Sequence, residues 1–206
     1  MFERVRSLLR APEAQAPAAR LPPGQRVYAI GDIHGRLDLF AALADAIEAE
    51  AAAARGVEST VILLGDLVDR GPDSASVIAG ARVWQQHRPL RILLGNHEEM
   101  FLKSFESIDV LRHFLRHGGR ETLMSYGVSR EDYAAASIEE VQRLLRARVP
   151  EEDVEFVSGF EDMIAIGDYL FVRLGRSWCT ATPSRRHRWW PPTGSGSTPA
   201  PMPADG

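Results

Sequence analysis

The sequence predicts an α/β fold in which parallel strands alternate with helices. Three apolar runs each lead into a glycine and then into a polar residue, at Gly31, Gly65 and Gly95. Unbroken apolar runs, such as V-I-L-L at residues 61–64, are typical of strands buried on both faces of a parallel sheet. The three glycines lie roughly 30 residues apart, which is the length of a β-α-β unit.

The strands and helices of this sheet follow one another in regular order. Strands are expected at residues 27–30, 60–64 and 90–94. A first helix is expected between residue 37 and Gly56, because apolar residues recur there at helical spacing. A second helix begins near Asp73 or Ser74, either of which suits an N-cap, and it ends before Pro89.

The chain changes character after the third strand. Residues 98–158 predict a mostly helical insert that lies over the site and shapes substrate access. A capping box at Ser137 and Glu140 marks the start of one of its helices, and Pro150 suits the first position of another. Residues 163–166 and 169–172 then predict a β-hairpin.

Both ends of the chain differ in composition from the middle. Residues 1–24 are rich in Ala and Pro and predict a flexible lead. Residues 25–172 form the predicted domain. Residues 173–206 hold the single cysteine, Cys179, and three of the four Trp residues, and they follow no helical or strand period. We therefore expect residues 173–206 to be an irregular, disordered tail.

Composition excludes several classes of protein. The net charge of -4 implies no general attraction to nucleic acid or to an anionic membrane. No apolar run approaches the ~18 residues of a transmembrane helix, and the N-terminal residues carry charges inside their apolar pattern, unlike a secretory signal. A single cysteine excludes an internal disulfide. A cytoplasmic location is expected, with no nucleic acid and no membrane as partners.

Metal-ligand side chains follow each of the three strands. Asp32 and His34 follow the first strand, Asp66 the second, and Asn96 and His97 the third. The carboxyl ends of parallel strands meet at one edge of a sheet, where open α/β sheets bind their ligands. Carboxylate, imidazole and amide oxygen together suit Mn²⁺, Fe²⁺ or Zn²⁺. The central carboxylate, Asp66, can bridge two such ions.

Three further side chains add the chemistry of phosphoryl transfer. Arg70 can grip a phosphate bidentately, and His97 can protonate a leaving oxygen while Asp69 fixes its tautomer. Each residue alone also has a structural interpretation: a helix cap for an Asp, a salt bridge for Arg70, a loop histidine for His97. His113 and His117 lie at i, i+4 and could chelate a metal, but we favour a solvated helix end for this pair.

Three motifs resemble those of a known family. GDIHG (31–35), GDLVDRG (65–71) and GNHE (95–98), in this order, resemble the calcineurin-like metallophosphoesterases, specifically the small bacterial serine/threonine phosphoprotein phosphatases. The stretch HGGRETLMSYG (117–127) is also similar, and the resemblance covers roughly residues 26–172. It implies a sandwich of two sheets flanked by helices. It also implies two divalent metal ions, Mn²⁺ first and Fe or Zn as alternatives.

The resemblance assigns metal ligands and also reveals a departure. Asp32, His34 and Asp66 would bind the first metal, and Asp66 and Asn96 the second. The family continues after Val172 with a His that completes the second site, whereas this chain continues with Arg-Leu-Gly. We therefore expect an impaired second metal site and a fold that is incomplete at its C-terminus. A frameshift near Val172 is the hypothesis that explains both the lost motif and the changed composition.

The function implied by the resemblance is metal-dependent hydrolysis of phosphoric monoesters. Attack by metal-activated water is expected, with His97 paired to Asp69 as the general acid and with Arg70 and Asn96 contacting the substrate. A serine/threonine protein phosphatase is the first interpretation, favoured by Asp69 within its motif. The substrate would be a phosphoprotein or a phosphorylated small molecule. A diadenosine tetraphosphate hydrolase and a non-catalytic remnant are the alternatives.

Overall fold

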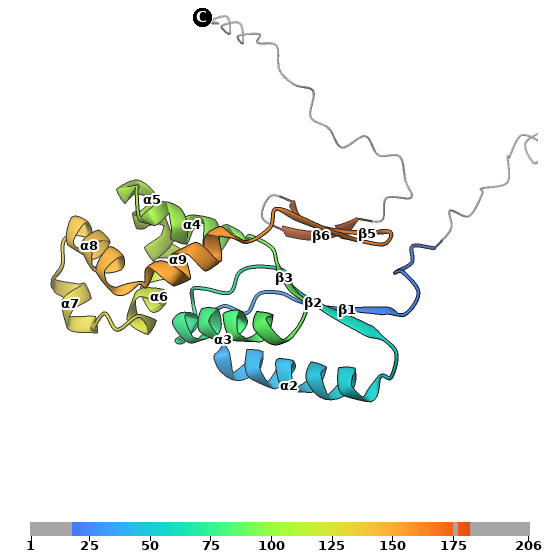
Figure 1. Ribbon diagram of the computed structural model, residues 1–206. Coiled ribbons are helices and arrows are strands. Elements are labelled where there is room, and N and C mark those ends of the chain that lie inside the picture. Colours follow the sequence, from blue (N-terminus) through green and yellow to red (C-terminus); the bar gives the residue numbers. More distant parts are fainter. Residues whose placement is uncertain (1–17, 175–176, 182–206) are drawn as a thin grey trace, which may run out of the picture.

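The parallel sheet forms the centre of the molecule (Figure 1). The computed structural model describes residues 18–174 and 177–181. The strands β1 (Gln25–Ile30), β2 (Glu58–Leu63) and β3 (Leu90–Ile92) pair in this order, all parallel. In the register, Ile30 lies beside Leu63, and Leu63 beside Ile92. The three strands therefore end level with one another, which brings the loops that follow them to the same edge, as predicted.

Two helices cover one face of this sheet. They are α2 (Leu37–Ala53) and α3 (Ser74–His87), which lie side by side in Figure 1. Phe40 of α2 meets Trp84 of α3 edge to face, with ring centroids 5.7 Å apart, over a core that includes Val61 and Leu63. The sequence pattern therefore identified both helices, but Leu43, which the periodicity placed on the apolar side of the first helix, is exposed.

A small antiparallel sheet packs against the other face. It consists of β4 (Met163–Ile166), β5 (Tyr169–Leu174) and β6 (Ser177–Ala181). Ile164 and Phe171 of this sheet pack on Ile62 and Leu93 next to the parallel sheet. The predicted hairpin is confirmed, because β4 and β5 pair antiparallel from Met163 to Val172. The architecture is thus a three-stranded parallel sheet between two helices and a second, three-stranded antiparallel sheet.

One expectation about the end of the chain is wrong where the structure describes it. We expected an irregular tail from residue 173, yet β5 continues to Leu174, and β6 pairs with it along residues 177–181. The physical reason is that the outer edge of β5 carries backbone N–H and C=O groups that need partners, and a strand of almost any composition supplies them. The rest of the expected tail, 182–206, lies outside the described residues, as do residues 1–17 of the expected lead.

The helical insert, residues 99–158, gathers at one end of the molecule (Figure 1). It has its own apolar core, in which Phe101, Phe114 and Leu145 are fully buried. The capping box of Ser137 and Glu140 is present, whereas Pro150 is an extended N-cap rather than the first helical residue. The elements of this region are α4 (Asn96–Ser104), α5 (Ile108–Phe114), η1 (Leu115–Gly119), α6 (Arg120–Ser125), α7 (Arg130–Ala135), α8 (Ile138–Arg148) and α9 (Glu151–Ser158).

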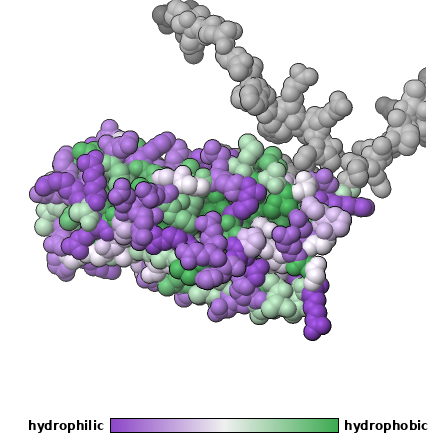
Figure 2. All heavy atoms as spheres, in the orientation of Figure 1, coloured by the Kyte–Doolittle hydropathy of each residue, from purple (hydrophilic) through white to green (hydrophobic). Residues whose placement is uncertain are grey.

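Helix α3 joins the insert to the sheet. Val77 and Ala81 pack in the core under the sheet, while Ile78 packs in the core of the insert. On the face seen in Figure 2, hydrophilic residues cover most of the insert, and apolar residues gather near the second sheet, where Met163 is exposed. Among residues 18–174 and 177–181, no helix is both long and apolar enough to cross a membrane.

Candidate active site

The loops after β1 and β2 hold an unusual backbone. Non-glycine residues rarely adopt positive φ, which costs about 1–3 kcal/mol each when the conformation is strained. Such strain persists only where the surroundings hold it, and it concentrates at functional sites. Within the described residues, all non-glycine residues with positive φ belong to the first two motifs: Asp32, His34, Asp66, Asp69 and Arg70.

A buried carboxylate holds the loop after β2. Glu98, on the first turn of α4, accepts hydrogen bonds from four backbone N–H groups at 2.7–3.3 Å, those of Asp66, Leu67, Val68 and Gly95. Glu98 is fully buried, which raises its pKa to about 7; the nearby charge of Asp66 adds to the rise, and the N–H donors oppose it. Sequence reasoning quoted Glu98 within its motif but assigned it no role. Its position three residues after Gly95, as in a capping box, was the available signal.

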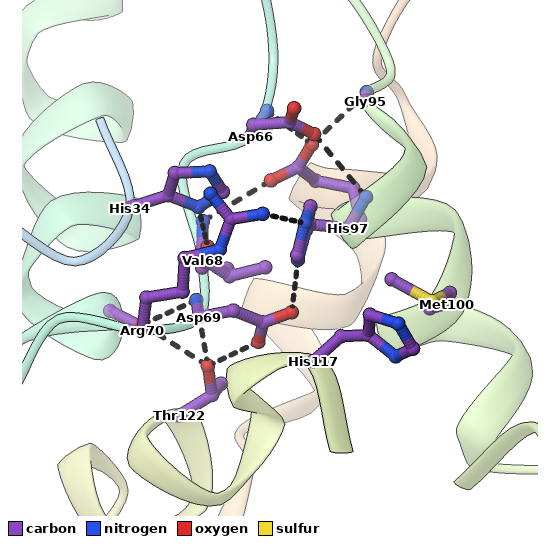
Figure 3. A network of polar contacts seen from close by, with 12 residues as sticks. His34, Asp66, Val68, Asp69, Arg70, Gly95, His97, Met100, His117 and Thr122 are labelled. Carbon is purple, nitrogen blue, oxygen red and sulfur yellow. Dashed lines mark hydrogen bonds and ion pairs between the residues drawn. The ribbon is translucent and has the colours of Figure 1, made fainter. Parts of the chain in front are cut away.

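Two predicted metal ligands, His34 and Asp66, and the predicted general acid, His97, converge on one pocket (Figure 3). Ligand atoms of His34, Asp66 and His97 all lie within 4.8 Å of one another. The Nδ1–H of His34 donates to the carbonyl of Val68 at 2.8 Å, which leaves Nε2 to face an ion. Two imidazoles and a carboxylate are a donor set that fits a divalent transition metal. The residues of this chain therefore fit the ion that the motifs imply.

Two further predicted ligands lie at the edge of this group. Oδ1 of Asp32 is 4.0 Å from Nε2 of His34, and the Asp32 side chain is 69% exposed. Asn96 begins α4 and lines the same pocket. The pocket has a volume of about 360 Å³. It is lined by Asp32, His34, Asp66, Arg70, Asn96, His97, Met100, His113 and His117.

His97 and Asp69 form the predicted dyad. The Nδ1–H of His97 donates to Oδ2 of Asp69 at 2.6 Å, and Asp69 is completely buried. Burial alone would lower the pKa of His97, but the hydrogen bond and the charge of Asp69 raise it above the ordinary value. Nη2 of Arg70 donates to the other ring nitrogen, Nε2, at 3.1 Å. The arginine and the histidine are thus in contact at the floor of the pocket.

Residues of the insert, distant in the sequence, form hydrogen bonds with Asp69 and Arg70. The hydroxyl of Thr122, on α6, donates to Oδ1 of Asp69 at 2.7 Å and accepts from the Asp69 N–H at 2.9 Å. The backbone N–H of Arg70 donates to the carbonyl of Gly118 at 3.1 Å. A Cβ on Gly118 would lie 2.6 Å from that nitrogen, and its φ is +110°, so only glycine fits there.

Sequence reasoning missed the roles of Thr122 and Gly118. Both belong to the stretch HGGRETLMSYG, which resembles the family but was not predicted to be part of the site. The sequence feature that could have indicated them is a pair of adjacent glycines followed closely by a threonine inside an otherwise helical segment. No local pattern, however, indicates that these residues touch a loop about fifty positions earlier.

The fold and the pocket define a metal-dependent phosphoesterase. In agreement, the profile of the calcineurin-like phosphoesterase family matches residues 25–194. The chain belongs to this family. The match extends beyond Val172, the point at which we expected the relationship to end.

Named relatives cover only part of this chain. A zinc-dependent endopolyphosphatase of Saccharomyces cerevisiae is 32% identical over 80 residues, which are 39% of this chain and 23% of that protein. A symmetrical bis(5'-nucleosyl)-tetraphosphatase of Delftia acidovorans is 31% identical over 106 residues, 48% of this chain and 35% of that one. The same enzyme of Paracidovorax citrulli is 42% identical over 72 residues, 35% of this chain and 23% of that one. The matched region thus spans 23–35% of the length of these relatives.

A solved structure described as a putative diadenosine tetraphosphatase covers 70% of this chain and 46% of its own, with 22% identity and a TM-score of 0.40. The relatives named above do not include a protein phosphatase. The match of the family profile confirms the prediction of a metallophosphoesterase at the level of the family, while the protein-phosphatase type predicted from the motifs gains no support from these relatives.

Proposed function

We propose that this chain is a metal-dependent hydrolase of dinucleoside polyphosphates, with diadenosine tetraphosphate as the type substrate. The observation that carries the hydrolase is the pocket, where a metal-ligand group, an Asp–His dyad and an arginine meet. The choice of substrate is supported by the names of the tetraphosphatases that the chain resembles.

His34 and Asp66 would hold a divalent ion, with Asp32 and Asn96 beside them. A bound ion of this type supplies an activated water and a positive charge for the phosphoryl oxygens. Of the described group His34, Asp66 and His97, the first two are left as metal ligands, because His97 is assigned to proton transfer below. Arg173, in place of the expected histidine, donates to Glu99 at 2.8 Å. We therefore propose a first metal site at His34 and Asp66, with Asp32 beside it, and a weaker second site at Asp66 and Asn96.

Arg70 would bind the phosphoryl group, and His97 would protonate the leaving oxygen. In this structure Nη2 of Arg70 donates to Nε2 of His97, so Nε2 carries a lone pair and Nδ1 carries the proton that Asp69 accepts. A bound phosphate would draw the guanidinium away, because a charge-assisted bond to phosphate is stronger than one to a neutral ring. The freed Nε2 then takes up a proton from solvent water, and it gives this proton to the leaving oxygen as the P–O bond breaks.

A protein phosphatase is the second candidate, and the observation that favours it is the DR pair within the motif at residues 65–71. In this structure both members of that pair contact His97. The dyad suits a poor leaving group such as a seryl oxygen, which requires protonation more than a nucleoside diphosphate does. Substrate choice therefore separates the two candidates.

The test is steady-state hydrolysis by the purified chain with Mn²⁺, beside Asp66→Asn and His97→Ala. Substrates would be diadenosine tetraphosphate, a phosphoserine peptide and p-nitrophenyl phosphate. We expect the tetraphosphate to be the best substrate and its turnover to be lost in Asp66→Asn. Faster hydrolysis of the peptide would overturn the proposal in favour of the phosphatase. A folded chain that hydrolyses none of the three and binds at most one metal would be the non-catalytic remnant.

A further inference from the structure

Two imidazoles in the pocket take no part in the mechanism described above. His113 lies in the last turn of α5, and His117 lies in η1. Both line the same pocket as Arg70 and His97, although they come from the insert. The pocket volume of about 360 Å³ falls in the range of roughly 300–1,000 Å³ that small-molecule ligands occupy. There is thus room for more than a single phosphate.

The side chain of His117 is exposed, and one hydrogen bond fixes which of its ring nitrogens faces a ligand. Its Nδ1 lies 2.8 Å from the carbonyl of His113, which can only accept, so Nδ1–H is the donor and Nε2 is the ring nitrogen left for a ligand. The two rings lie 4.1 Å apart at 41°. The next residue, Gly118, binds the backbone N–H of Arg70, so the position of His117 is tied to that of the arginine.

Two cationic side chains of the insert form ion pairs with neighbouring carboxylates. Arg112 pairs with Asp109, and Lys103 pairs with Glu99. The carboxylates in the pocket, Asp32 and Asp66, belong to the metal group. Among the residues that line the pocket, His113 and His117 are the ionisable side chains that α5 and η1 contribute, so a negative charge beyond the one Arg70 binds would meet them on this side. Figure 3 shows the His117 ring near Met100, a residue of α4 that lines the same pocket.

We propose that His117, supported by His113, is an anion subsite for the phosphate next to the one under attack, so that the pocket selects chains of two or more phosphates over monoesters. This inference rests on the proposed function, since such chains are the substrate class proposed above. An imidazole beside a phosphate takes up a proton and donates from Nε2, because a nearby opposite charge favours its charged form. The helical run of α5 and η1 is broken at Gly118, directly after His117, and a helix C-terminus favours the same charge.

The test is calorimetric titration of inorganic tripolyphosphate and of orthophosphate into the metal-free chain. We expect His117→Ala to bind tripolyphosphate at least about tenfold more weakly than the wild type, as for a hydrogen bond to a charged group. Orthophosphate affinity should fall much less. His117→Gln, which keeps a donor near Nε2, should recover part of the loss. His87→Ala is the matched control, because His87 is exposed at the end of α3 and does not line the pocket.

Equal tripolyphosphate affinity of His117→Ala and the wild type would overturn the subsite, as would an equal loss for both anions. Failure of the wild type to bind tripolyphosphate would overturn it as well. None of these results depends on turnover. Absence of tetraphosphate hydrolysis would therefore count against the proposed function alone, and a failed titration against the subsite alone.

Discussion

The two regions that meet at the pocket contribute different things. The metal rim, which comprises the loops at residues 31–35, 65–71 and 95–98, supplies the atoms that face an ion or a phosphate. The helical insert supplies Thr122, which donates a hydrogen bond to the carboxylate of Asp69, and Gly118, whose carbonyl accepts one from the backbone N–H of Arg70. The rim is strained, with positive φ at five non-glycine residues, whereas the insert is mostly helical around an apolar core and has its positive φ angles at glycines.

This difference shows how a strained loop is maintained. A left-handed backbone at Asp69 and Arg70 is unfavourable on its own, so it needs hydrogen bonds that only this conformation can make. The Asp69 N–H is bonded by Ser74 and Thr122, and the Arg70 N–H by Gly118. The rim thus carries the proposed catalytic groups, and the insert stabilises the backbone conformation of the rim. Each prediction below tests one side of this comparison.

The largest loss of activity should follow from a substitution in the rim. Asp66→Asn replaces the central ligand by an amide and should lower kcat/KM by about a thousandfold or more, since metal stabilisation of the transition state amounts to several kcal/mol. Metal content per chain, measured by mass spectrometry, should fall with it. Asp73→Asn is the control, because Asp73 is exposed at the start of α3 and its side chain makes no capping bond. Full metal content in Asp66→Asn would contradict the assignment.

An intermediate effect should come from the insert. Thr122→Val keeps the shape of the side chain but removes the bond to Oδ1 of Asp69, so the dyad loses its orientation. We expect kcat to fall about 10–100-fold, as for other groups that orient a site from behind. Thr122→Ser, which keeps the hydroxyl, should retain most of the activity. If the Val variant were as active as the wild type, the insert would not position the rim in the way described.

A third effect should appear in stability rather than in rate. Glu98→Gln leaves one acceptor oxygen where the carboxylate offers two, and at least two buried N–H groups lose their partners. The free energy of unfolding should fall by about 2 kcal/mol or more. Urea unfolding of the metal-free chain would measure it. Glu99→Gln is the matched control, since Glu99 is partly exposed and its ion pairs contribute about 1 kcal/mol or less.

The same carboxyl predicts a dependence on pH. Because burial raises the pKa of Glu98 to about 7 from 4.5, the folded chain holds a proton between these values that the unfolded chain has lost. The contribution of Glu98 to stability is therefore fully present below pH about 4.5 and is lost as pH rises toward 7. Glu98→Gln should flatten the stability curve in this window. An unchanged slope would show that Glu98 does not titrate there.

The smallest effect should come from the far side of the insert. Ser137→Ala removes the capping box of α8 and should cost about 1 kcal/mol of stability, seen as a lower melting temperature. Activity should stay within about twofold, because this cap lies far along the insert from the residues that hold the rim. Ser129→Ala, at the cap of α7, should cost less, since α7 buries no residue. A marked loss of activity in Ser137→Ala would mean that the whole insert, and not only η1 and α6, sets the rim.

Much of the fold and of the rim could be predicted from local patterns. The apolar runs that end at Gly31, Gly65 and Gly95 indicated parallel strands, and their level ends in the structure bring together His34, Asp66 and His97. The hairpin at residues 163–172 and the helical insert followed from turn and periodicity signals. The sequence also indicated the dyad of His97 and Asp69, because residue type and motif spacing are local information.

Only the tertiary structure decided what holds these residues. Thr122, Gly118 and the imidazoles of His113 and His117 reach the pocket because the insert folds back over the rim, and no periodicity along the chain encodes such a distant contact. The pairing of β6 with β5 was missed for a related reason, since backbone hydrogen bonds form with little regard to composition. The sequence determined which groups could bind a metal and a phosphate, and the packing of the insert determined in which conformation they stand ready to do so.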